Sequence, residues 1–497
     1  GAVIQLTPKT EAVRSKGAPV VPHDNTLPQV PEDRGWSYDV QKLQIADSVL
    51  FFQHEDGEQV TVRDIRLQME QDSSHRATVD FSGRVNRDQR DLALSFNGTV
   101  DASDYPHNLS ANIEQLSWQL QGADLPPQGI NGQGHLQAQW LEEKKQLSFS
   151  QINLTANDSS FSGQAHVALL EKPEWAVDLK FGQLNLDNLL VQHDAAVTAK
   201  GEVQQGQSQS TLARPVIASQ VDAVSYQGLK GFSADIALQA DKVLWRKMAF
   251  ENVSAKIDNR FGLLSIAQLQ GKSDGGLISL PGTLDARKGE PRAVFHPRLE
   301  GVEIGTILKA FDYPIALTGK LSLAGDFSGS DIDAQAFRHS WQGQAHVEMN
   351  DTRMEGMNFQ QMIQQAVERS GGDAKAQQNM ENVTRLDHFV TDMTLDNGEV
   401  TLDNMVGESA MLALTGKGTL DLVKQNCDTL FNIRVLGGWD GESKLINFLK
   451  ATPVPLRVYG QWQSLNYSLQ VDQLLRKHLQ DEAKRRLNDW ADRNKDS

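Results

Sequence analysis

Histidines and carboxylates are the side chains in this sequence that could perform acid–base chemistry or bind a metal. The chain has 12 histidines, but those in the strand-like regions stand singly rather than at the close spacings of metal ligands. They include His54, His107, His135, His166, His193 and His346. His166 and His346 have equivalent places in alternating stretches, opposite the apolar residues, which predicts solvated side chains. His54 precedes Glu55 and Asp56, and we interpret these three residues as a hairpin turn.

Two carboxylate pairs, Asp331 with Asp333 and Asp440 with Glu442, stand beside glycines in predicted loops. A hydrolase would need converging carboxylates or a triad in a cleft, and the sequence offers no such set. It also has no phosphate-binding loop, HExxH motif, nucleophile elbow or EF-hand loop. Glycines 129, 132 and 134 resemble a dinucleotide fingerprint in composition only, because they do not open a helix after a strand. We therefore expect no enzyme activity, no cofactor and no metal site.

Composition narrows the classes of partner. Lysine and arginine number 48 against 64 acidic residues, and the resulting net charge of −16 repels phosphate backbones and anionic surfaces at long range. We expect no nucleic-acid partner. The single cysteine, Cys427, excludes an internal disulfide and a thiolate metal site. No apolar run approaches the roughly 18 residues of a membrane-spanning helix, and the first residues already read as a strand, so we interpret the chain as part of a longer protein.

Most of the sequence alternates apolar and polar residues, with glycines between the alternating runs. Examples are the segments 92–100, 161–169, 277–284 and 412–422. Alternation with a period of two places the apolar side chains on one face of a strand. The predicted fold is therefore mostly β: a long twisted antiparallel sheet of repeated groove units with an apolar inner face, plus a few helices including a C-terminal one. Turn signals stand at Asp56–Gly57, Asn97–Gly98, Asn131–Gly132 and Asn157–Asp158.

The predicted organisation follows from changes in composition along the chain. Prolines in residues 8–35 predict a mobile loop after a first strand, and the polar residues around 191–215 predict a linker. The predicted divisions are 1–35 (strand and mobile loop), 36–190 (first groove region), 191–215 (linker), 216–440 (second groove region) and 441–497 (C-terminal segment). Helices are predicted at 302–311, 358–369, 443–450 and 473–492. The five residues Gly163–Val167 recur as Gly343–Val347, which suggests a structural repeat.

The apolar strand faces are the candidate functional residues. Those expected to line the interior are Leu92, Leu94, Phe96, Val100, Leu116, Trp118, Leu120, Phe161, Val167, Leu169, Val177, Leu179, Phe181, Leu317, Leu321, Leu323, Leu412, Leu414, Leu420 and Leu422. Two such sheets could close on each other as a sandwich core. Alternatively, the sheet curls into a trough whose inner face stays open, and an acyl chain of about 15 carbons would gain roughly 12 kcal/mol there.

Four segments near the C-terminus resemble the AsmA-like family of Gram-negative envelope proteins. They are 317–329, 350–359, 436–441 and 453–462, and the resemblance covers essentially the whole chain. It implies a periplasmic β-rich body, held at the inner membrane by an N-terminal helix that this sequence lacks, and similar to chorein-type bridge-like lipid transfer proteins. It also implies phospholipid transport toward the outer membrane, with roles in outer-membrane assembly and lipopolysaccharide homeostasis. After Trp462 the chain lacks a proline often found in the family, so this end of the groove can differ.

Two functions from different classes remain open. The first is a lipid conduit that binds phospholipid or another acyl-chain lipid, with a possible partner at the outer membrane. The helices predicted at 302–311, 358–369 and 473–492 would close or gate it. The second is an assembly factor that binds segments of outer-membrane proteins by adding strands to an exposed sheet edge. A charged residue at Leu94 or Leu321 should stop lipid binding and leave edge binding intact.

Overall fold

A computed structural model describes residues 14–15, 42–54, 59–71, 75–87, 89–191, 226–330, 332, 334–369, 375–376, 381–440 and 444–495. Strands account for 63% of the described residues, so the predicted mostly-β class is confirmed. The chain forms two compact units, one of residues 1–271 with 284–289 and the other of 272–283 with 290–497. The predicted linker at 191–215 and the loop at 8–35 lie almost wholly outside the described residues.

Unit 1 is built from long strands of 10 to 15 residues. They are β2 (Lys42–His54), β3 (Gln59–Gln71), β4 (Arg76–Arg87), β5 (Arg90–Asp101), β6 (Asn108–Gly122), β7 (Ile130–Leu141), β8 (Gln146–Ala156), β9 (Ser159–Ala168), β10 (Glu174–Asn185), β11 (Ser233–Trp245), β12 (Met248–Arg260) and β13 (Leu263–Ser273), the last of which reaches unit 2. Strands β2 to β10 form an antiparallel meander. Strand β11 then pairs parallel with β10, and β12 antiparallel with β11. A two-residue strand, β1 (Arg14–Ser15), pairs parallel with β2.

Two of the predicted turns are wrong. Asn97–Gly98 lies inside β5, and Asn131–Gly132 lies inside β7. At Gly98 the register with β6 shifts by one residue, and a methyl group there would overlap the Asn112 carbonyl oxygen. The glycine therefore permits a close approach of two strands at a bulge rather than a reversal of the chain. Asn157, with φ of 52°, does form the predicted turn between β8 and β9, whereas Asp56–Gly57 lies outside the described residues.

Unit 2 combines strands with helices. Its strands are β14 (Gly276–Ser279), β15 (Gly282–Asp285, shared with unit 1), β16 (Arg292–Phe295), β17 (Arg298–Glu303), β18 (Leu317–Gly329), β19 (Gln342–Glu355), β21 (Val383–Asp396), β22 (Glu399–Glu408), β23 (Leu412–Asp421), β24 (Asn426–Val435), β26 (Val454–Gln461) and β27 (Ser464–Leu469). Its helices are α3 (Ile304–Ala310), α4 (Ala334–Ser340), α5 (Phe359–Arg369), α6 (Lys444–Ala451) and α7 (Asp472–Arg493). The order β14-β17-β18-β19-β21-β22-β23-β24-β26-β27 is antiparallel throughout. Strand β16 also pairs with β18, and β20 (Lys375–Ala376) pairs separately with β25 (Trp439–Asp440).

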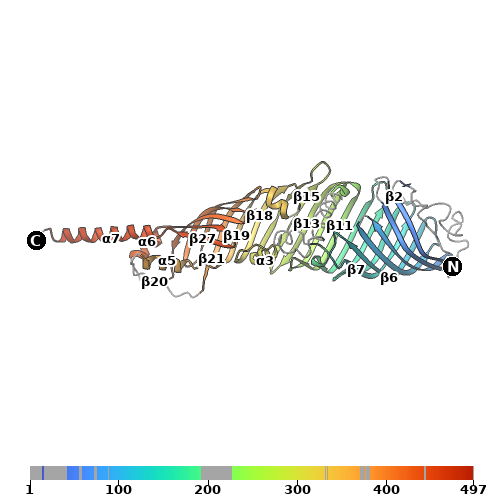
Figure 1. Ribbon diagram of the computed structural model, residues 1–497, viewed down its shortest axis with the longest axis horizontal. Helices are drawn as coiled ribbons and strands as arrows, with labels where there is room; N and C mark the ends of the chain where they lie inside the picture. The colour runs from blue at the N-terminus through green and yellow to red at the C-terminus, as the bar shows by residue number, and fades with distance from the viewer. Residues whose placement is uncertain are drawn as a thin grey trace. The chain divides into compact units, whose positions relative to one another are not determined.

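Four helices occur where the sequence predicts them, within two residues at each end, while α4 was not expected. Helix α5 buries the stripe of Phe359, Ile363, Ala366 and Val367 that its spacing predicts. Helices α5, α6 and the start of α7 lie together at the C-terminal end of unit 2 (Figure 1). Their apolar sides and those of β23, β24 and β26 form one buried cluster, which is the main core of this unit.

Candidate functional site

The predicted apolar residues of β5 and β6 lie on one face of the sheet. The ladder pairs Leu92 with Leu120, Leu94 with Trp118 and Phe96 with Leu116. Across β4 the same face continues through Phe81, whose ring stacks on Phe96 at a centroid distance of 5.2 Å. Val100 packs against the small cluster that contains Val79 and Met69. Non-adjacent parts of the sequence are thus joined into one apolar surface by the register of the strands.

The same surface continues over β9 to β12. Phe161 pairs with Phe181 across the ladder, and their rings lie 5.2 Å apart. Parallel pairing then places Val177 beside Ile236 and Leu179 beside Leu238. Val167, in the first copy of the repeated five residues, faces the same way and is only 1% exposed. Leu169 follows the end of β9 and is 47% exposed, so it lies outside this face.

Burial distinguishes a packed core from an open face. The predicted lining residues from Leu92 to Leu120, and Phe161, Val177, Leu179 and Phe181, are all half-buried rather than fully buried. A sandwich core would bury side chains of this size almost completely. Helical structure in the described part of unit 1 is limited to 186–188 and 226–231, so no long helix covers the sheet there. The apolar face of unit 1 is therefore partly open to solvent.

Two glycines shape this face. Gly132 stands opposite Trp118, and a methyl group at this position would overlap the indole ring. Gly163 stands opposite Leu179 with φ of 141°, a conformation that favours glycine. The missing side chain leaves room for the Trp118 ring at Gly132 and for the backbone of Asp178 and Leu179 at Gly163.

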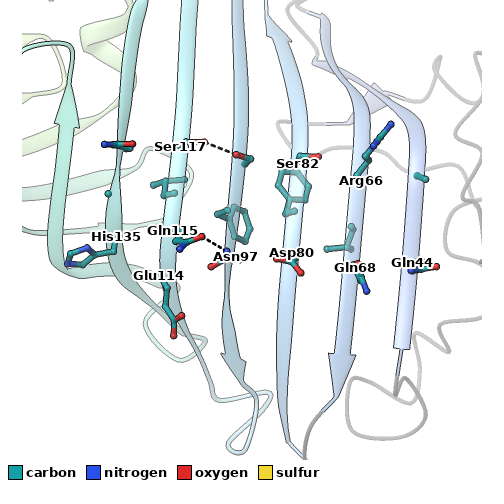
Figure 2. A pocket seen from close by; sticks show the side chains of 18 residues that line it. Gln44, Arg66, Gln68, Asp80, Ser82, Asn97, Glu114, Gln115, Ser117 and His135 are labelled. Atoms are coloured by element: carbon teal, nitrogen blue, oxygen red, sulfur yellow. Dashed lines mark hydrogen bonds between the residues drawn. The ribbon is translucent and has the colours of Figure 1, made fainter.

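A hollow of about 1,120 Å³ lies over β2 to β7, and polar side chains line it together with Leu67, Phe81, Phe96 and Leu116 of the apolar rows. Figure 2 shows Gln68, Asp80, Asn97 and Gln115 in one row across adjacent strands, as their register requires. Asn97 donates to Gln115 at 2.8 Å, and in a second row the hydroxyl oxygens of Ser95 and Ser117 lie 2.7 Å apart. These polar side chains thus pair with one another across adjacent strands.

In unit 2 the apolar face is covered in places. Leu317, Leu321 and Leu323 on β18 gather with Val347 and Met349 of β19. Helix α3 packs against this cluster through its apolar side, and Leu321 is only 5% exposed. Leu321 is therefore part of a packed core.

Farther along unit 2, helices cover the apolar face around Leu412 and Leu414 completely. Leu412 and Leu414 are 5% and 8% exposed and belong to the cluster beneath α5, α6 and α7. The structure thus places them in a closed core rather than on an open face, because sequence alternation does not reveal a helix packed on top. Leu420 is half-buried beside Cys427, and Leu422 follows the end of β23.

Cys427 shares the apolar side of the sheet with Leu420. Its thiol lies 3.9 Å from the Val458 carbonyl oxygen, and burial raises the thiol pKa. A raised pKa keeps the sulfur as a neutral thiol, which makes it a poor nucleophile. Cys427 therefore contributes apolar surface here.

No metal or catalytic cluster emerges from the candidate acid–base residues. His107, His135 and His166 are exposed, while the His54 side chain, His193, Asp331, Asp333 and Glu442 lie outside what the structure describes. No group of three or more histidine, cysteine or acidic side chains in the described ranges could hold a metal ion. His346 is exposed, but it lies 2.9 Å from Asp392 and 3.3 Å from Glu348.

The His346–Asp392 pair predicts a pH dependence. Hydrogen bonding to Asp392 and then Glu348 raises the pKa of His346 above 6.5. Protonated His346 stabilises the folded chain fully at pH values below the pKa that His346 has in the unfolded chain. This stabilisation is lost as the pH rises through the pKa of His346 in the folded chain. His346 in turn lowers the pKa of Asp392. The stability that the ionised Asp392 contributes is therefore lost as the pH falls through the pKa of this carboxyl group in the folded chain.

An NMR titration of His346 tests the pairing. Asp392→Asn should lower the pKa of His346, whereas the control Asp396→Asn, on the same strand, should leave it unchanged. Equal effects of the two variants would contradict the pairing.

The fold and its exposed residues define a class: a one-sided, mostly antiparallel sheet whose apolar face is partly open in unit 1 and partly closed by helices in unit 2. Residues 66–405 match the AsmA family. The chain is 71% identical to Protein AsmA of Escherichia coli (strain K12) over 497 residues, which cover all of this chain and 81% of that protein. The chain belongs to the AsmA family, and the predicted resemblance is confirmed. No solved structure matches it, and no described helix is both long and apolar enough to cross a bilayer.

Proposed function

We propose that this protein binds phospholipid on the apolar face of its sheet and carries it through the periplasm toward the outer membrane. It acts at the inner membrane, in support of outer-membrane assembly and lipopolysaccharide homeostasis. The single observation that carries the proposal is the set of half-buried apolar side chains on β5, β6, β9 and β10. Such a surface needs an apolar occupant, because leaving it in water forfeits roughly 25 cal/mol for each Å².

The chemistry of the two faces supports a lipid as the occupant. One side of each strand offers leucine, valine and aromatic side chains, and the other offers serine, asparagine, glutamine and charged residues. An acyl chain lying across the ladders would contact only apolar groups, while its polar headgroup could remain in water. Nothing in this binding mode requires a cofactor or a catalytic residue.

Native mass spectrometry of the purified chain tests the proposal. We expect phospholipid to co-purify and to be identified by lipid extraction, and we expect delipidated protein to take up a fluorescent phospholipid. A folded protein that arrives free of lipid and takes up none would contradict lipid binding.

A further inference from the structure

The C-terminal helix α7 has two parts with different surroundings. Its first turns are docked, because Leu475 is fully buried and the His478 ring stacks on Phe448 with centroids 4.3 Å apart. Lys444 of α6 also lies 3.8 Å from Glu482. Beyond Glu482 every residue of the helix is exposed, and α7 extends away from the strands of unit 2 (Figure 1).

This second part carries the most exposed large apolar side chains found in the described residues. Leu487 is 64% exposed and Trp490 is 61% exposed. At 100° per residue they lie on one side of the helix with Ala483. Two large apolar groups held side by side in water cost free energy unless something covers them.

Cations outnumber carboxylates around this apolar stripe, and they stand at both of its edges. On the same helical projection Arg486 and Arg493 border one edge of the stripe and Lys484 borders the other, whereas Arg485, Asp489 and Asp492 lie away from it. Lys495 follows the end of α7. The segment 484–495 holds five cations and two carboxylates, a net charge of +3, in a chain whose net charge is −16. This segment is therefore locally positive in a chain that is negative as a whole.

We propose that the second half of α7 binds the surface of a membrane that contains anionic phospholipid. Leucine and tryptophan enter the region between headgroups and acyl chains, and the flanking lysines and arginines reach the phosphates along their aliphatic stems. The carboxylates opposite the stripe remain in water. A protein partner would not need cations along both edges of an apolar stripe, whereas an anionic bilayer attracts them on both sides.

Sedimentation of the full chain with phosphatidylcholine vesicles, with and without phosphatidylglycerol, tests this proposal. Binding should require phosphatidylglycerol and should weaken as sodium chloride is added. The double variant Leu487→Gln with Trp490→Gln should lower the partition coefficient about tenfold or more. Neutralising Lys484, Arg486 and Arg493 to glutamine should lower it roughly a hundredfold.

Matched controls distinguish membrane binding by this helix surface from lipid binding by the sheet face and from loss of the fold. Asp489→Asn with Asp492→Asn changes the same turns of α7 but should preserve or strengthen binding, and circular dichroism should show every variant folded. Equal sedimentation of the Leu487/Trp490 variant and the parent would overturn the proposal. So would light scattering that shows a dimer lost in this variant without any vesicle binding, because a second copy would then cover the stripe. Loss of vesicle binding only when the sheet face carries a charge would also overturn it.

Discussion

Leu94→Asp is expected to lower the phospholipid that co-purifies with the chain by about tenfold or more, because an acyl chain cannot lie over an ionised carboxylate without desolvating it. Leu94 stands opposite Trp118 at the middle of the open face of unit 1. It is half-buried, so the carboxylate can reach water in the empty protein and the fold should persist. Lipid extraction with mass spectrometry, normalised to protein, gives the measurement.

Ser95→Asp is the matched control, since it places the same charge one residue along β5 on the polar face. Lipid content should stay at the level of the parent chain. Equal loss in both variants would point to a general effect of charge and contradict the proposed face. If the chain instead binds protein segments by strand addition, neither variant should reduce peptide binding at a sheet edge. Leu321 is unsuitable for this test, because it is buried beneath α3.

The second large effect is expected for Leu449→Ala, which should lower the free energy of unfolding of unit 2 by about 2–5 kcal/mol. Leu449 of α6 is fully buried in the cluster that closes the sheet against α5 and α7. Removing three side-chain carbons leaves a cavity there that the surrounding strands cannot fill. Hydrogen exchange should show faster opening of β24 and β26, alongside a lower midpoint in urea.

Leu436→Ala supplies the comparison within the same unit. Leu436 is 40% exposed and follows β24, so the same truncation there should change stability by less than about 0.5 kcal/mol. A similar loss at both positions would mean that the helices do not form a packed closure.

The sequence predicted the faces of strands well and their surroundings poorly. Alternation placed Leu94, Phe96 and Trp118 on a common face, because side-chain direction in a strand depends only on the parity of the position. It could not distinguish Phe96, which is half-buried, from Leu414, which is 8% exposed under a helix. The turn predicted at Asn97–Gly98 was wrong for a related reason. An Asn-Gly pair is a local signal for a turn, but Gly98 is required because β6 passes close to it, and that contact depends on pairing across the sheet.

Histidines and carboxylates in this chain illustrate the same limit on the polar side. Their scattered spacing gave no sign that His346 pairs with Asp392, which is 46 residues away in the sequence. By itself, the sequence determined the β class, the polarity of each strand face, the four helices with apolar stripes and the membership of the AsmA family. Only the tertiary structure decided which stretches of the apolar face stay open and which are closed. That outcome depends on helices arriving from distant positions, and no local pattern encodes where a helix packs.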